Sequence, residues 1–228
     1  MPELPDITVY IEALEKRILG AMLEDVRIVS PFLLRTAIPP VRNAIGKKVV
    51  RIRRIGKRIC IGFENDIWFV LHLMIAGRLH WRQRGAEISP RQNFAAFDFP
   101  DGSLLWSEAG SKKRASLHVI AGEDNLQNLD AGGIDVMECS YDEFARELRS
   151  ENHTLKRSLT DPRMFSGIGN AYSDEILWEA KLSPVAMTQK LSDDAIDRLF
   201  KATRTTLDLW IQKLREKYKD NFPEKVTA

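Results

Sequence analysis

Near the start of the chain, apolar residues recur every three or four positions. They are Ile7, Ile11, Leu14 and Ile18. This spacing places the apolar side chains on one face of an α-helix. Asp6 precedes the first of them and is a typical N-cap residue, and Gly20 follows the last. The pattern therefore predicts a helix that begins after Asp6 and ends at Gly20.

From residue 23 to about residue 120, the pattern changes to short runs rich in β-branched and aromatic residues. The runs are 26–29, 48–55, 58–63, 67–73, 78–82, 93–99, 103–107 and 115–120. Turn sequences separate several of them, Glu-Asn-Asp at 64–66 and Pro-Asp-Gly at 100–102 being the clearest. Many short strands in succession predict two packed sheets, as in a sandwich or barrel.

Beyond this region the pattern becomes helical. An acidic stretch with weak periodicity at 122–140 is interpreted as a linker, and helices are predicted at 141–149, 154–160, 170–180 and 193 to about 218. Ser192 is the expected cap of the last helix, which contains neither Gly nor Pro. A β half followed by an α half predicts two domains, at residues 1–121 and 141–228, on either side of the linker.

Composition narrows the class of protein. The 228 residues are 44% hydrophobic and 29% charged, as in a globular chain, and 34 basic against 32 acidic residues leave a net charge of +2. Cys60 and Cys139 are far apart, which argues against a disulfide scaffold and a zinc site. The N-terminus does not resemble a signal peptide, and no apolar run is long enough to span a membrane. We therefore expect an intracellular protein.

Basic residues cluster at 47–58, where seven of twelve positions are Lys or Arg and none is acidic. The plainer explanation is a solvated strand edge protected by charge. Seven cations without a carboxylate repel one another, however, unless an anion such as a nucleic-acid backbone is present. A second basic cluster, Lys112-Lys113-Arg114, follows a Gly-bearing turn. The two explanations have about equal weight.

A glycine pair precedes the helix predicted at 170–180, in the sequence Ser-Gly-Ile-Gly-Asn at 166–170. Glycines at a helix start let backbone N–H groups approach a phosphate, and the helix dipole favours its charge. An ordinary turn between helices explains the glycines equally well. The following helix favours the first interpretation, because two helices joined in this way form a common DNA-binding arrangement.

The N-terminus is a third candidate. Removal of Met1 would make Pro2 a free secondary amine, which titrates near about 8 and is partly neutral and nucleophilic at physiological pH. Glu3 beside it is a candidate proton donor and acceptor. By itself this feature carries little weight, since most Met-Pro-Glu starts have no catalytic meaning.

Together these segments resemble a known family. The opening PELPD, the region of Lys57, the run HLMIAGRL at 72–79 and above all LKRSLTDPRMFSGIGNAYSDEIL at 155–177 are similar to the formamidopyrimidine-DNA glycosylase and endonuclease VIII family. The likeness covers nearly the whole chain in order. It implies an α+β multidomain fold with an N-terminal helix and a β-sandwich, then a helical domain with a helix–two-turn–helix motif.

The resemblance also implies an activity. Members of the family flip a damaged base out of the duplex, cut its glycosidic bond and cleave the abasic site by elimination. Pro2 would be the Schiff-base nucleophile and Glu3 the acid and base that opens the sugar. Lys57 would act at the phosphate beside the lesion, where Lys156 and Asn170 of the helical domain also bind. The implied partner is damaged double-stranded DNA, bound by a monomer in the bacterial cytosol.

The chain departs from the family at three places. Where the family has an intercalating methionine in HLGMSG, this chain has Met74 and Ile75, so either could be the wedge. The loop at 108–114 lacks the aromatic residue that fills the space left by the flipped base, and Arg114 is the remaining candidate. The four-cysteine zinc finger of many relatives is absent, so the chain is either truncated before the finger or a member without one; we favour truncation and expect no cofactor in this chain.

Two further expectations follow. The tryptophans at 68, 81, 106, 178 and 210 fall on apolar faces and should belong to the core. The leading functional hypothesis is a bifunctional DNA glycosylase and AP lyase that acts on oxidised bases. The alternative is a non-catalytic protein that binds damaged DNA on the same scaffold, since the loop expected to fill the vacated space is altered.

Overall fold

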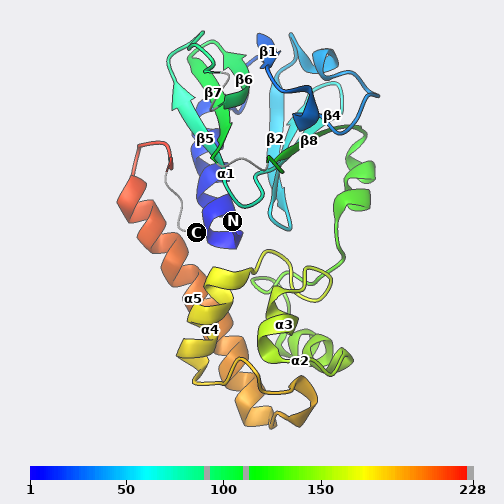
Figure 1. Cartoon of the computed structure of the whole chain (residues 1–228), viewed down its shortest axis with the longest axis vertical. Helices are drawn as coiled ribbons and strands as arrows, with labels where there is room; N and C mark the ends of the chain where they lie inside the picture. The colour runs from blue at the N-terminus through cyan, green and yellow to red at the C-terminus, as the bar shows by residue number, and fades with distance from the viewer. Residues whose placement is uncertain (90–92, 110–112, 225–228) are drawn as a thin grey trace.

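A computed structural model of the chain describes residues 1–89, 93–109 and 113–224. Strands form one end of the molecule and helices the other, and the segment after β8 connects them (Figure 1). The predicted fold class, an N-terminal helix with a β-sandwich followed by a helical part, is confirmed. In the described residues, each end of the predicted strands and of the four later helices lies within one residue of its prediction.

Helix α1 (Leu4–Ile18) begins earlier than the sequence pattern suggested. Its N-cap is Glu3 and not Asp6 as predicted, but Asp6 takes part in the cap as the N3 residue of a capping box. Asp6 lies in the first turn, where its carboxylate accepts the N–H of Glu3 at 2.9 Å. It thereby satisfies a backbone donor near the helix start, and the helix dipole favours its charge. Gly20 follows the helix with φ of 78°, a conformation that glycine adopts without strain.

Eight strands form two antiparallel sheets. They are β1 (Asp25–Ile28), β2 (Val49–Ile55), β3 (Arg58–Phe63), β4 (Ile67–His72), β5 (Gly77–Arg82), β6 (Asn93–Phe99), β7 (Gly102–Glu108) and β8 (Ser116–Ala121). One sheet has the order β1-β6-β7-β5 and the other β2-β3-β4-β8. The turn between β4 and β5 and the segment between β7 and β8 each cross from one sheet to the other, and 3-10 helices η1 (Pro31–Leu33) and η2 (Val41–Ala44) lie between β1 and β2.

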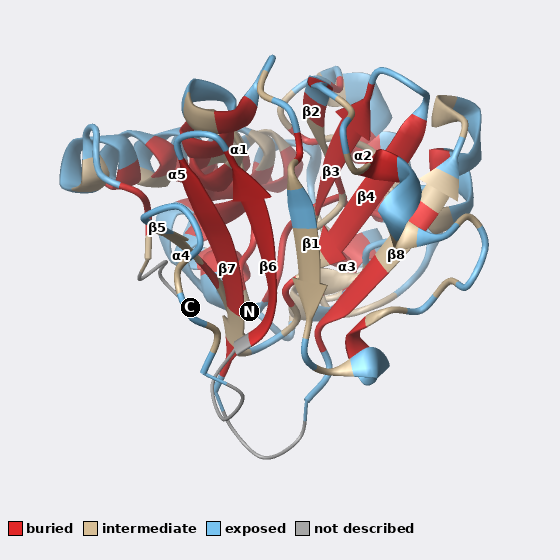
Figure 2. Ribbon diagram, turned by 90° about the horizontal axis from the view of Figure 1, so that it is seen from above, coloured by how far each residue is buried: buried red, intermediate tan, exposed pale blue. Residues whose placement is uncertain are grey.

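The apolar side chains of alternate strand positions meet between the two sheets. In β3, Ile59, Ile61 and Phe63 belong to this core, and the ring of Phe63 packs 4.8 Å from that of Phe69 on β4. The central strands are accordingly buried along most of their length (Figure 2). Helix α1 adds Tyr10 to the same core. Burial of this apolar surface, worth about 25 cal/mol per Å², is the main force that holds the sandwich together.

The helical part has a second core. The helical part consists of α2 (Tyr141–Ser150), α3 (Leu155–Thr160), α4 (Asn170–Ala180), α5 (Asp193–Tyr218) and the 3-10 helix η4 (Thr188–Lys190), whose apolar side chains form this core. The predicted cap of α5 is confirmed, because Ser192 Oγ accepts the N–H of Ala195 at 3.2 Å. Trp178 on α4 is 85% exposed, so its expected place in the core is wrong. Of the helices in the described ranges, none has the length and apolar character needed to cross a membrane.

The linker carries the carboxylates that the basic strand was expected to lack. It contains a 3-10 helix, η3 (Glu123–Leu129), and the carboxylate of Glu123 pairs with Arg51 at 2.8 Å and with Arg53 at 2.6 Å. Asp135, further along the linker, pairs with Arg54. The premise that the cations at 47–58 have no compensating carboxylate is therefore wrong. The partners are distant in sequence and meet the edge strand β2 only in the fold.

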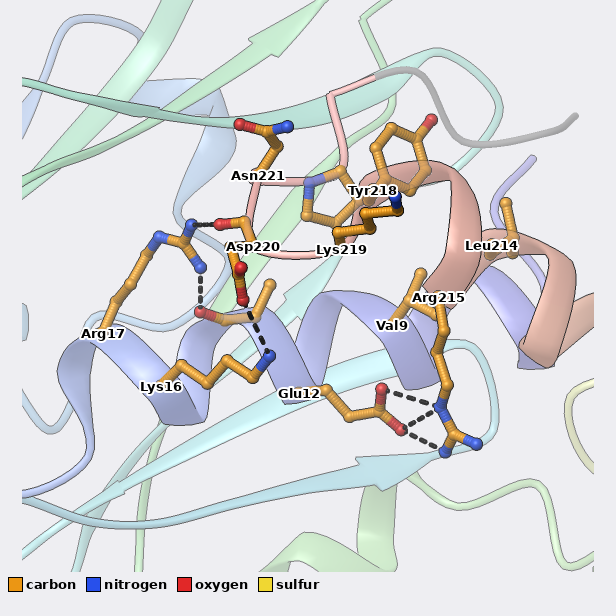
Figure 3. A pocket seen from close by; sticks show the side chains of 12 residues that line it. Val9, Glu12, Lys16, Arg17, Leu214, Arg215, Tyr218, Lys219, Asp220 and Asn221 are labelled. Atoms are coloured by element: carbon orange, nitrogen blue, oxygen red, sulfur yellow. Dashed lines mark hydrogen bonds and ion pairs between the residues drawn. The ribbon is translucent and has the colours of Figure 1, made fainter.

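The two ends of the chain interlock. Leu4, at the start of α1, is buried in the core of the helical part, whereas Phe222, after α5, is buried in the core of the sandwich. Phe222 packs against Tyr10, and the guanidinium of Arg17 lies 5.4 Å from the centre of its ring. The segment after α5 thus folds back along α1, where Arg17 donates to the carbonyl of Asp220 at 2.7 Å (Figure 3).

We expect Phe222→Ala to destabilise the protein by about 3 kcal/mol, because it removes a ring buried at the junction of α1 and the sandwich. Phe32→Ala is the matched control. Its ring is 79% exposed, so the free energy of unfolding should change by less than about 0.5 kcal/mol. Urea denaturation of both variants measures the difference, and equal effects would contradict the packing described for Phe222.

Candidate active site and nucleic-acid interface

The carboxylate of Glu3 lies at the N-terminus of α4. It accepts backbone N–H groups from Gly169 at 2.7 Å, from Ala171 at 3.0 Å and from Tyr172 at 3.2 Å. A helix start leaves these donors without intrahelical partners, and its dipole favours a negative charge. The sequence predicted a phosphate at this position, and the anion that the structure places there is the Glu3 side chain, which is 2% exposed.

Gly169 is required by this arrangement. A Cβ atom at this residue would lie 2.5 Å from the Glu3 carboxylate carbon and 2.7 Å from Lys57 Nζ. Both distances are shorter than any side chain allows. Lys57 itself follows Gly56, whose φ of 56° turns the chain between β2 and β3 toward α4. The close approach of Glu3, Lys57 and the α4 backbone therefore depends on a residue without a side chain.

The ammonium of Lys57 is partly removed from water. Burial lowers the pKa of Lys57 below its ordinary value, and the negative charge of Glu3 acts in the opposite direction. A cation held in such a position is prepared to meet an anion, because part of its dehydration has already occurred in the fold. The positive charge of Lys57 therefore faces the site and is only partly compensated by the negative charge of Glu3.

Pro2 is buried beside Glu3, with Met1 half-buried before it. The N–H of Leu4 donates to the carbonyl of Gly167 at 2.9 Å, which holds the start of the chain against the loop before α4. The pKa of the Met1 ammonium is lowered, first by burial and then by the positive charge of Arg78, while Glu3 raises it. The environment at the chain start therefore favours a neutral amine.

Lys156 and Asn170 are brought together on the helical side of the site. Lys156 Nζ donates to the carbonyl of Asn170 at 2.7 Å and pairs with Asp174 at 2.6 Å. The side chain of Asn170 is exposed at the first residue of α4, one residue from Gly169. The two predicted phosphate ligands therefore lie at the same helix end as the Glu3 carboxylate.

The two candidate wedges lie in the turn between β4 and β5. Ile75 is 59% exposed at the tip of this turn, whereas Met74 is half-buried and has φ of 54°. Gly77 closes the turn, because a Cβ there would lie 2.2 Å from the carbonyl oxygen of Leu73. Exposure at the tip favours Ile75 over Met74 as the residue available to a ligand.

Arg114 lies in the segment between β7 and β8, of which residues 110–112 are outside the described ranges. Its side chain is exposed, and its backbone N–H donates to the buried carboxylate of Glu108 at 2.9 Å. Glu108 pairs with Gly77 across strands β7 and β5, so the base of this segment lies beside the turn that bears Ile75. The structure thus groups Arg114 with the candidate wedges, and Lys57, Lys156 and Asn170 with Pro2 and Glu3.

Sequence reasoning missed several residues of this region. Arg54 and Asp135 form an ion pair between β2 and the linker, and Arg78 lies near the chain start. Tyr172 donates its hydroxyl to Asp6 at 3.4 Å. Arg54 was visible only as one of seven cations in a basic strand, and nothing in its spacing marked it as different from its neighbours.

The residues present do not fit a four-cysteine zinc site. Cys60 is buried against β4 in a small core beneath η3, and Cys139 is buried in the core of the helical part. Across the described ranges, no group of three or more His, Cys, Asp or Glu side chains could hold a metal ion.

Two family models match this arrangement of a sandwich followed by a helical part. Residues 1–111 match the model of the formamidopyrimidine-DNA glycosylase N-terminal domain, and residues 135–219 match the model of the formamidopyrimidine-DNA glycosylase H2TH domain. The chain belongs to the formamidopyrimidine-DNA glycosylase family, and it is a DNA glycosylase of base excision repair.

Curated relatives agree with this assignment. The formamidopyrimidine-DNA glycosylase of Carboxydothermus hydrogenoformans is 29% identical over 215 residues, which are 93% of this chain and 78% of the relative. That of Mycoplasma genitalium is 28% identical over 205 residues, which are 88% of this chain and 72% of the relative.

Solved structures show the same fold. Lactococcus lactis Fpg bound to DNA that contains an oxidized pyrimidine superposes with a TM-score of 0.84 at 25% identity, over 92% of this chain and 80% of that one. A Lactococcus lactis Fpg variant bound to DNA that contains Fapy-dG has a TM-score of 0.84 at 25% identity, over 92% of this chain and 79% of that one.

We expect Gly169→Ala to lower the single-turnover rate of base release by about 100-fold, because its Cβ would displace Glu3 and Lys57. Gly85→Ala is the control, since Gly85 has φ of 72° but no atom within 4 Å of the added Cβ. That change should cost about 1–2 kcal/mol of stability and leave the rate of the folded protein unchanged. A normal rate in Gly169→Ala would show that the close approach is not needed.

Proposed function

We propose that this protein is a bifunctional enzyme that releases oxidised bases and then cleaves the abasic site through an N-terminal proline. The observation that supports it most directly is the place of Glu3, which is held by three backbone N–H groups directly after Pro2. Residues 1–121 and 141–228 would form the two sides of the DNA-binding cleft.

The chemistry begins with removal of Met1, which makes Pro2 a secondary amine. Its nitrogen attacks C1′ of the flipped nucleoside, and the bond from C1′ to the base breaks with its electron pair leaving on the base. The Glu3 carboxylate takes the proton that the Pro2 nitrogen loses on attack and delivers it to the ring oxygen, so that the sugar opens and an iminium links Pro2 to C1′. The released base takes a proton from water. Loss of a proton from C2′ then expels the 3′ phosphate, and water releases the protein from the cleaved strand.

Lys57, Lys156 and Asn170 would hold the phosphates beside the lesion. Partial burial of Lys57 supports this role, because an anion brought to it replaces hydration that the fold has already removed. Ile75 is the stronger candidate for the wedge because it is exposed at the turn, and Arg114 is available beside it. These side chains lie on both parts of the molecule, so binding DNA would also fix the two parts relative to each other.

Oxidised bases are the proposed substrate class. Its support is the similarity to solved complexes with an oxidized pyrimidine and with Fapy-dG. One chain contributes every residue of the proposed site, which supports a monomer as the active form, and the bacterial relatives support a place in the cytosol. The amine and carboxylate chemistry uses no cofactor.

Borohydride trapping on a duplex with a pre-formed abasic site tests the nucleophile. The processed protein should form a covalent complex with the DNA, because the iminium is reduced to a stable amine. Pro2→Gly should lose most of that complex, and a form that retains Met1 should form much less of it, because its Pro2 nitrogen is an amide and the free amine lies one residue away, on Met1. If processed protein that binds the duplex forms no complex, it is a non-catalytic binder of damaged DNA.

Glu3→Gln should separate the two activities in the same assay. Base release should fall below detection because the proton donor is lost, while part of the trapping at a pre-formed abasic site should survive because Pro2 remains. The Gln amide would also face an N–H of α4, at a cost of about 1–3 kcal/mol, so the melting temperature is measured alongside. Equal loss of both activities at full folding would show that Glu3 only positions Pro2.

Lys57→Ala and Lys156→Ala should each weaken binding to duplexes with or without a lesion. Each should also lower the slope of log affinity against log salt concentration by about one unit, because one fewer counterion is released. Fluorescence anisotropy at four salt concentrations gives the slopes. Asn170→Ala is the neutral comparison, since it should weaken binding without changing the slope, and an unchanged slope in a lysine variant would remove that lysine from the interface.

A further inference from the structure

Arg54 contacts three segments of the chain at once. Its guanidinium donates to the carbonyl of Gly56 at 3.0 Å and to Ser166 Oγ at 3.4 Å, and it forms an ion pair with Asp135. The side chain is only 16% exposed. These contacts join β2, the loop before α4 and the linker, which lie up to 112 residues apart in sequence.

Each of these contacts fixes a segment that carries part of the candidate site. Gly56 begins the turn that presents Lys57. Ser166 begins the loop that leads to Gly169, whose N–H holds the Glu3 carboxylate. A Cβ at Gly167 would lie 3.0 Å from the Arg54 guanidinium, so the loop packs directly on this side chain.

Asp135 is itself held firmly. Its carboxylate accepts the N–H of Met137 at 3.0 Å, and its carbonyl accepts the N–H of Cys139 at 2.9 Å. Arg204 of α5 donates to the carbonyls of Val136 and Met137, both at 3.0 Å. The partner of Arg54 therefore belongs to a rigid connection between the linker and the helical core, and not to a mobile surface chain.

The neighbouring arginines of β2, Arg51 and Arg53, are more exposed than Arg54 and contact fewer segments of the chain. In the described part of the chain, Arg51 and Arg53 pair with Glu123 alone, and their side chains are 58% and 40% exposed. Exposed pairs of this type contribute little to stability. Arg54 is mostly buried, and its planar guanidinium can direct several N–H groups to fixed acceptors, which a lysine cannot.

We propose that Arg54 is a positioning residue, which holds the Lys57 turn and the Glu3-binding loop of α4 in register without touching the DNA. This inference rests on the proposed function of Lys57 and Glu3. Loss of the guanidinium would let the two parts of the site shift relative to each other. A displacement of about 1 Å is enough to lower a rate by about 100-fold.

Arg54→Gln and Asp135→Asn test the proposal together. Both should lower the single-turnover rate of base release at saturating protein by about 100-fold, while the half-saturating protein concentration stays within about threefold. The double variant should be little slower than either single one, because both changes break the same connection. Arg54→Lys, which keeps the charge but not the planar guanidinium, should recover only part of the rate.

Asp135→Asn separates this explanation from a direct contact with DNA. If Arg54 bound a phosphate, removal of the competing carboxylate would leave or improve affinity and would not slow base release. A fast Asp135→Asn variant beside a weakly binding Arg54→Gln variant would therefore overturn the proposal. Normal rates in both variants, when the wild type forms the borohydride-trapped complex, would also overturn it while leaving the proposed function intact.

The control is an ion pair of similar burial whose arginine, among the residues described, bonds within the sandwich, to Asp98 and to the carbonyl of Ala86. Arg27 pairs with Asp98 at 2.6 Å within one sheet, with side chains 29% and 10% exposed. Arg27→Gln should lower the melting temperature by an amount comparable to Arg54→Gln and leave the rate of base release unchanged. Equal rate losses in the two variants would show that general destabilisation, and not positioning, explains the effect of Arg54.

Discussion

The Glu3 carboxylate at the N-terminus of α4 is the contact on which the rest of the site depends. Three backbone N–H groups that no helical residue can satisfy meet a charge supplied by the first turn of α1. Because α1 packs in the sandwich and α4 in the helical core, this contact also sets how the two halves meet. The residue proposed as the proton donor and acceptor therefore also joins the two halves of the molecule.

The positive charge of strand β2 is also compensated by residues that are distant in sequence. Two carboxylates from the linker partly neutralise the three arginines of β2, with Glu123 on its exposed arginines and Asp135 on its buried one. The exposed pairs contribute little energy, whereas the buried pair costs much to break because an isolated charge would remain out of water. Lys57, in the turn that follows this strand, has no such linker partner in the described residues and faces Glu3 and the site. Lys57, the cation of this region that lies at the site, is therefore the one proposed to bind a DNA phosphate.

The interlocked ends of the chain give this arrangement its rigidity. Leu4 is packed in the helical core and Phe222 in the sandwich, so separation of the two parts would expose apolar surface at both places. Contacts between Arg17 and the segment after α5 lie at the far end of α1 from Pro2 and Glu3. Helix α1 is consequently held at both ends, which limits the movement available to the residues at its start.

Local sequence determined the elements of this protein. Short runs of β-branched and aromatic residues between turn sequences predicted the eight strands, and helical spacing with Ser192 as cap predicted α5, because these patterns depend on neighbours along the chain. Family motifs identified Pro2, Glu3, Lys57, Lys156 and Asn170 as candidates, and the structure brings them to one place. The sequence also showed that glycines precede α4, although not which anion they would admit.

Only the tertiary structure decided which side chains contact one another. The pattern did not separate Asp6 from Glu3 as the N-cap, because the two residues form a reciprocal capping box; the contact of Glu3 with α4, more than 160 residues away, is visible only in the fold. The carboxylates that balance β2 are some 70 to 81 residues from their arginines, beyond the reach of any local pattern. Hydrophobic periodicity reports only whether a side chain faces the core, and so it could not show that Trp178 is exposed or that Arg54 holds three segments together. Those facts arise from how separate elements pack, which is a property of the whole fold.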